Sequence, residues 1–125
     1  MNYGEIQASI IARSHRTDLA SHVPEFVALA ESEYNRRTGA TYDLTSGTSS
    51  THNWVSDNAP DVYIYGGLMQ LAVWTQDDNA LQKFTALFER AVETAHYAEV
   101  RESGITTEPL TIEAGIPSSY DIMAD

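Results

Sequence analysis

Cysteine is absent from this sequence of 125 residues, which excludes disulfide bonds, thiolate zinc sites and a thiol nucleophile. Basic residues are scarce: seven Lys and Arg stand against eighteen Asp and Glu, for a net charge of −11. An acidic excess of this size repels nucleic acid, so it disfavours an ordinary DNA-binding module. No apolar run reaches the roughly 20 residues that span a bilayer, and no apolar segment follows a basic N-terminus. We therefore expect one domain with one modest core, without a membrane span or signal peptide.

Motifs for catalysis are also missing. The sequence has no HExxH, no GxSxG and no GK[ST] loop, and its four histidines lack the helical spacing of metal ligands. His15 and His22 flank a polar segment, which leaves a metal-dependent enzyme as a minor alternative. The paired aspartates stand beside expected helix starts, where negative charge stabilises a helix in any case. We expect no enzyme activity, no cofactor and no metal.

The most informative stretch is residues 53–75, NWVSDNAPDVYIYGGLMQLAVWT. Its second half is apolar on every side, which predicts a buried central helix. Asn58 is the expected N-cap, Pro60 suits the first turn, and Asp61 adds negative charge there. Two glycines inside a helix cost roughly 1.5–2 kcal/mol relative to alanines, so Gly66 and Gly67 predict very close packing with another element. The alternative is a strand over 62–65 with a turn at the glycines.

Three further helices follow from spacing and capping signals. Residues 2–12 carry a capping box of Asn2 and Glu5, and residues 23–37 end before Gly39. Residues 79–102, capped by Asp77 or Asp78, show the strongest helical periodicity. In the second helix we expect Glu31 on the solvent side. Residues 16–19 suggest a short turn and residues 39–52 an exposed loop. The fold class is therefore all-α: a small bundle of about four helices with a buried central helix and an extended C-terminal tail.

The C-terminal residues do not continue the helical pattern. Pro109, Gly115 and Pro117 argue against a long helix over residues 105–125. The segment is nevertheless too apolar for a solvated tail, so we expect an arm that lies on a partner. The alternative is that it packs on its own bundle. The domain boundary is placed between a helical domain, 1–104, and the arm, 105–125. The expected interface residues are Leu110, Ile112, Ile116, Tyr120, Ile122 and Met123.

The segment from Asn53-Trp54 through Asn58-Ala59-Pro60-Asp61-Val62-Tyr63-Ile64-Tyr65-Gly66 resembles the head-tail connector (adaptor) proteins of tailed bacteriophages and related gene-transfer particles. The resemblance covers about residues 1–104. The motif residues that carry it are Trp54, Pro60, Asp61, Tyr63, Tyr65 and Gly66. Relatives often hold a β-rich insertion before the N-W pair, whereas only residues 39–52 are available here.

The resemblance implies a structural virion protein at the head-tail interface, assembled in the host cytoplasm. Its partners would be the portal protein, other copies of itself in a ring of twelve, and a downstream tail or stopper protein. DNA would pass through the ring's channel without specific binding, which suits the acidic composition. The alternative function is a small acidic helical regulatory protein that binds a single protein partner.

Overall fold

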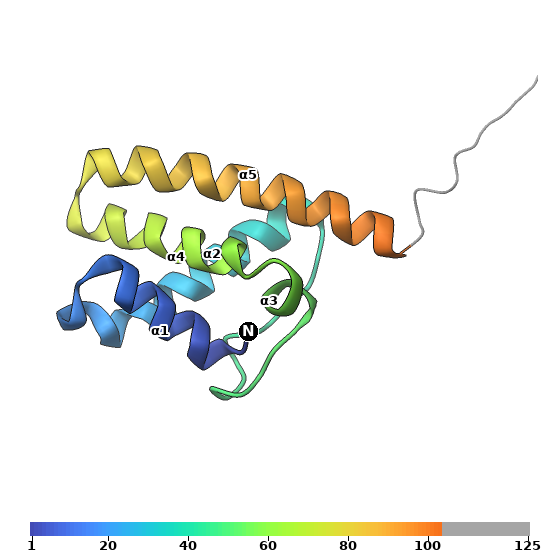
Figure 1. Ribbon diagram of the computed structural model, residues 1–125, viewed down its shortest axis with the longest axis horizontal. Helices are drawn as coiled ribbons and strands as arrows, with labels where there is room; N and C mark the ends of the chain where they lie inside the picture. Colours follow the sequence, from blue (N-terminus) through green and yellow to red (C-terminus); the bar gives the residue numbers. More distant parts are fainter. Residues whose placement is uncertain (104–125) are drawn as a thin grey trace, which may run out of the picture. The chain divides into compact units, whose positions relative to one another are not determined.

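The computed structural model describes residues 1–103 of the chain. Its elements are α1 (Tyr3–Ser14), the 3₁₀ helix η1 (Thr17–His22), α2 (Val23–Thr38), α3 (Trp54–Asn58), α4 (Pro60–Thr75) and α5 (Asp78–Ser103). Residues 1–95 form one compact unit, and residues 96–103 are the last turns of α5. Residues 1–103 contain no strand (Figure 1), so the all-α prediction is confirmed and the alternative strand over 62–65 is wrong.

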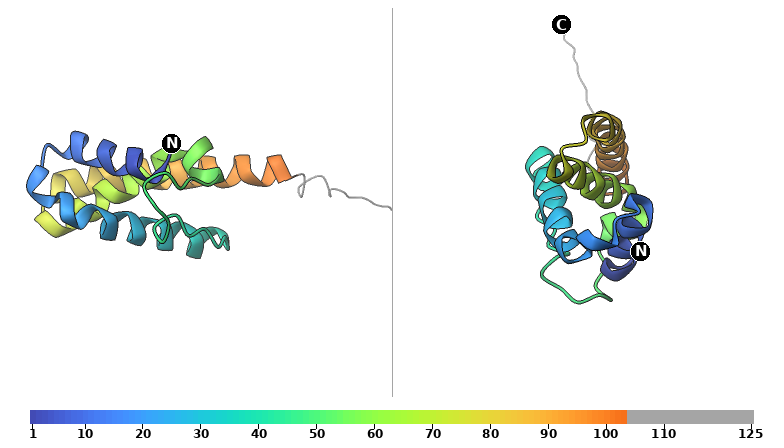
Figure 2. Two further views of the ribbon diagram at one scale, coloured as in Figure 1. Left: turned by 90° about the horizontal axis from the view of Figure 1, so that it is seen from below. Right: turned by 90° about the vertical axis from the view of Figure 1, so that its left-hand side faces the viewer.

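Helix α4 is the central element of the compact unit. It packs against α1, α2 and α3, and the end-on view in Figure 2 shows it between α1, α2 and the beginning of α5. Eight of its sixteen residues are buried, which agrees with the expectation of a buried helix over its middle turns. The last turn differs from the prediction, because Val73 and Trp74 are 53% and 52% exposed. The rings of His22 and Phe26 cover only part of Trp74, with centroid distances of 4.7 and 6.1 Å.

The glycine pair marks the closest helix contacts, as predicted. A Cβ atom built on Gly66 would lie 2.5 Å from Ala30 Cβ of α2 and 2.9 Å from the Phe88 ring of α5. A Cβ atom on Gly67 would lie 2.5 Å from Ile10 Cδ1 of α1. Both glycines therefore let neighbouring helices approach α4 more closely than any other residue would allow.

Most helix ends follow their sequence signals. Asn2 and Glu5 form the expected capping box, Gly39 ends α2 with a φ of 76°, and Asp77 caps α5 through the Ala80 N–H at 3.1 Å. The prediction that Asn58 caps the central helix is wrong.

Asn53, further upstream, is the N-cap of a separate short helix, α3. It forms a capping box with Ser56 there. Asn58 ends α3 and donates a hydrogen bond to the Trp54 carbonyl. Pro60 disfavours helical backbone at the preceding residue, and Ala59 accordingly adopts φ −144° and ψ 57°. Helix α4 therefore begins without a side-chain cap.

The loop between α2 and α3 is held at both ends. Near its start, the Asn35 side chain bonds to the backbone N–H and carbonyl of Tyr42. Near its end, the Ser49 and Thr51 carbonyls accept hydrogen bonds of 2.8 Å from the first N–H groups of α1. The loop is largely exposed as predicted, but Leu44 within it is buried in the core.

Candidate functional site

A buried carboxylate joins three parts of the bundle. Glu31 of α2 is only 4% exposed, so its predicted place on the solvent side is wrong. Its carboxylate accepts a 2.6 Å hydrogen bond from the Tyr63 hydroxyl of α4 and a 2.7 Å bond from the backbone N–H of Leu44 in the loop. Buried carboxylates need such donors, because an unpaired one is costly to remove from water.

The motif residue Tyr63 links this network to Asn53, the first residue of the N-W segment. The Asn53 side-chain amide donates a 3.0 Å hydrogen bond to the Tyr63 hydroxyl, and the same side chain caps α3 by accepting from the Ser56 N–H. Burial raises the pKa of Tyr63 well above its ordinary value, and the adjacent Glu31 also contributes. The phenol therefore stays protonated and serves as a donor to Glu31. This half of the motif fixes α3 and the loop to α2.

The other motif residues divide between the core and the surface. Gly66 is buried, Trp54 packs half-buried against the core, and Pro60 and the exposed Asp61 form the first turn of α4. Tyr65 is half-buried and lines a surface cavity. The motif is therefore mainly architectural, and Tyr65 is its link to a candidate binding surface.

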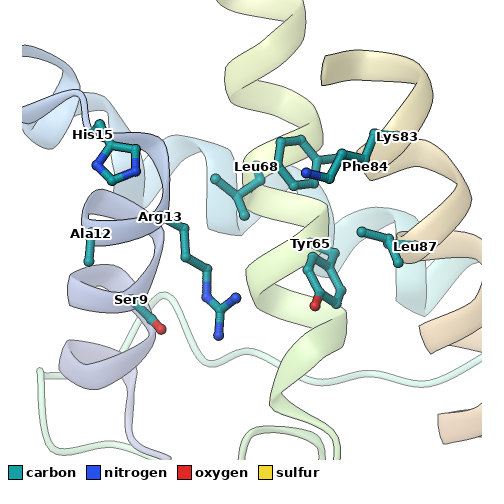
Figure 3. Close-up of a pocket in the computed structure, with 9 residues that line it drawn as sticks. All are labelled: Ser9, Ala12, Arg13, His15, Tyr65, Leu68, Lys83, Phe84 and Leu87. Carbon is teal, nitrogen blue, oxygen red and sulfur yellow. The ribbon is translucent and has the colours of Figure 1, made fainter. Parts of the chain in front are cut away.

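That surface is a groove over α4, between α1 and the first turns of α5 (Figure 3). It encloses about 610 Å³, a volume typical of ligand pockets. A second, smaller cavity of about 230 Å³ shares Arg13, Leu68 and Phe84 in its lining. The larger cavity alone is here named the α1–α5 groove. The larger cavity is lined by Ser9, Ala12, Arg13, His15, Tyr65, Leu68, Lys83, Phe84 and Leu87.

The groove combines an apolar lining with positive charge. Tyr65 of α4 and Phe84 of α5 stack with their ring centroids 6.4 Å apart, and Lys83 Nζ lies 5.4 Å from the centre of the Phe84 ring. Within residues 1–103, Arg13 and Lys83 have no carboxylate partner, although the chain carries eighteen acidic residues. This combination suits a ligand that is both apolar and anionic.

The two histidines of the metal hypothesis lie in different surroundings. His15 lines the α1–α5 groove, whereas His22 stacks on Trp74. No group of three or more His, Asp or Glu side chains in residues 1–103 is arranged to hold a metal ion. The structure therefore gives the metal-dependent alternative no site among these residues.

The six expected interface residues of the arm lie outside the described residues. Within residues 1–103, large apolar side chains are exposed at Met1, Leu29, Val73, Trp74 and Tyr97. None of the helices described there combines the length and apolar character needed to cross a membrane.

Comparison with known protein families identifies a matching family model. The model of the SU10 adaptor protein family matches residues 40–112, more than half of the chain. The chain belongs to the SU10 adaptor protein family. This is a family of phage head-tail adaptors, which confirms the resemblance carried by the motif around Tyr63. The protein is therefore a structural adaptor of a phage particle that works with other head or tail proteins. Comparisons with curated proteins and with solved structures gave no match.

Two features of this adaptor were not predicted from its sequence. Glu31 shares a helical face with Val27, Ala30 and Tyr34, and that spacing could have indicated its burial. The α1–α5 groove left no comparable signal, because its cationic residues Arg13 and Lys83 lie on helices far apart in the sequence.

Proposed function

We propose that the protein docks as a ring of twelve copies on the portal vertex, extends the DNA channel and links the head to the tail or stopper protein. The observation that carries this proposal is the family match over residues 40–112, which includes the whole N-W to Y-G segment. The compact helical unit of residues 1–95 gives each copy a body from which a ring can be built.

The charge of the chain supports a channel role. A net charge of −11 per copy, repeated around a pore, repels the phosphate backbone of DNA. DNA would then pass without binding specifically to the channel wall. The apolar residues of the C-terminal segment, from Leu110 to Met123, supply the contact to the portal or to a neighbouring subunit in this proposal.

The test is co-expression with the portal protein from the same source, followed by electron microscopy of the complexes that co-purify. We expect a rotationally symmetric ring of this chain stacked on the portal, with the copy number visible directly. A chain that remains a monomer or small closed oligomer in the presence of portal would contradict the proposal. That result would favour a regulatory protein with a single partner.

A further inference from the structure

The α1–α5 groove is a built surface for which residues 1–103 supply no occupant. Its floor is formed by Tyr65 and Leu68 of α4, and one wall is formed by Phe84 and Leu87 of α5 (Figure 3). Arg13 stands on the α1 wall and Lys83 on the α5 wall. An apolar floor below two unpaired cations is suited to a segment that has both apolar and acidic side chains.

The C-terminal segment of the same sequence has this composition. Residues 105–125 contain no Lys or Arg and seven large apolar side chains, which are Ile105 and the six expected interface residues. The carboxylates of the segment are Glu108, Glu113, Asp121 and Asp125. Two of them, Asp121 and Glu113, lie within the apolar stretch between Leu110 and Met123. The segment therefore complements the groove in charge and in apolar character.

We propose that the α1–α5 groove binds residues 110–123 of a second copy of this chain. The apolar side chains of the segment pack on Tyr65, Leu68 and Phe84, and its carboxylates pair with Arg13 and Lys83. Fully extended, the 21 residues of the segment reach on the order of 70 Å, compared with a radius of gyration of about 13 Å for a unit of this size. The segment is long enough to reach a neighbouring copy.

A contact between the arm of one copy and the groove of the next is heterologous, because the two surfaces differ. Repeated with a closing rotation, a heterologous contact produces a ring. The choice of a second copy therefore rests on the proposed ring, whereas recognition of the segment by the groove does not.

Recognition is tested by titrating a labelled synthetic peptide of residues 105–125 with the full-length chain and following fluorescence anisotropy. We expect saturable binding that weakens by at least about tenfold in the Arg13→Glu/Lys83→Glu double variant, because both cations face the groove. Arg90→Glu is the matched control, since Arg90 is an exposed cation of α5 that does not line the groove. Absence of binding, or equal weakening by the control, would overturn the proposal.

That the bound segment comes from a second copy is tested by disulfide trapping. The chain has no cysteine of its own that could form a competing disulfide. Ser9→Cys in the groove and Ser119→Cys in the segment are placed on separate chains, mixed and oxidised, with Ser32→Cys on the exposed side of α2 as control. We expect a cross-linked pair with Ser9→Cys and only background with Ser32→Cys. Equal yields, or a disulfide formed only within one chain carrying both cysteines, would refute a second copy as the donor.

The same trapping in the portal complex separates this inference from the proposed function. A ring on the portal without the disulfide between positions 9 and 119 would refute the inference and leave the proposed ring intact. Peptide binding in a chain that never joins the portal would refute the ring and leave recognition by the groove.

Discussion

Gly66 and Gly67 are adjacent in α4 but face different kinds of neighbour. The space beside Gly66 is bounded by the Ala30 methyl group, which is attached directly to the backbone, and by the fully buried Phe88 ring. The space beside Gly67 is limited mainly by Ile10 Cδ1, the end of a flexible side chain. The two positions therefore differ in how much an added methyl group would cost.

We expect Gly66→Ala to destabilise the fold by about 1–3 kcal/mol through overpacking, despite the helix propensity that alanine adds. Gly67→Ala should have a clearly smaller effect, because Ile10 can shift its terminal methyl group. Gly67→Leu should again cost about 1–3 kcal/mol, since a leucine side chain exceeds that space. Urea unfolding of the three variants measures the differences, and equal stabilities of the two alanine variants would contradict the ranking.

Tyr63 and Tyr65 provide a second comparison of neighbouring residues. Removing the Tyr63 hydroxyl takes a donor from the buried Glu31 and leaves the Asn53 amide without its acceptor. We expect Tyr63→Phe to destabilise by about 1–3 kcal/mol, the range for buried polar groups that lose a partner. Tyr65→Phe should be close to neutral, because no hydrogen bond of the Tyr65 hydroxyl is found within residues 1–103. Thermal unfolding compares the two, and equal losses would mean that the buried network adds nothing specific.

At the scale of elements, α2 and α5 are joined by an ion-pair cluster. Arg37 of α2 contacts Glu33 one turn earlier at 2.6 Å and reaches Glu89 of α5, with Nη2 at 2.8 Å from Oε2. Its guanidinium holds the pKa of both carboxyls below the ordinary 4.5. Carboxyls with lowered pKa values contribute stability above about pH 4.5, and this contribution is lost as the pH falls through their folded-state pKa values.

We therefore expect Arg37→Met to lower the free energy of unfolding at pH 7 by up to about 1 kcal/mol, a limit set by solvent screening of exposed pairs. The difference from the parent should shrink at acidic pH, once both carboxyls are protonated. Arg90→Met is the control, because Arg90 shares α5 with Glu89 and forms no ion pair in the described part of the chain. Urea titrations at both pH values give the comparison, and a pH-independent difference would point to lost packing on Phe88 instead.

Local sequence signals predicted where the helices begin and end better than they predicted how the helices contact one another. Asn2 with Glu5 and Gly39 marked helix ends correctly, because each acts within one turn of its own position. The prediction that Asn58 caps the central helix failed, because Pro60 and the cap at Asn53 together create a separate short helix that Asn58 ends. The burial of Glu31 depends on Tyr63, 32 residues away, and the groove depends on how α1 and α5 both pack on α4. Such long-range arrangements leave little trace in sequence spacing.

At the scale of the whole molecule, the buried core of the described residues ends before the last turns of α5. Every buried core residue found within residues 1–103 lies at or before Ala95. We propose that residues 105–125 contribute to assembly and little to the fold.

Deleting residues 105–125 should therefore leave the helical circular dichroism signal and the unfolding temperature nearly unchanged while abolishing ring formation with the portal. A truncated chain that is unfolded would show instead that the segment completes the core. A truncated chain that still assembles would remove the segment from the interface. Circular dichroism and electron microscopy of the same preparation decide between these outcomes.

The double attachment of the loop between α2 and α3 has a consequence for how such proteins diversify. Leu44 and the contacts of Tyr42 fix one end, the bonds to the start of α1 fix the other, and residues 46–48 between them are exposed. Lengthening a loop whose ends are already fixed costs little, roughly 0.6 kcal/mol for each doubling of its length. We therefore expect that a foreign peptide inserted after the exposed Ser46 could be displayed on every copy while both attachments of the loop are kept.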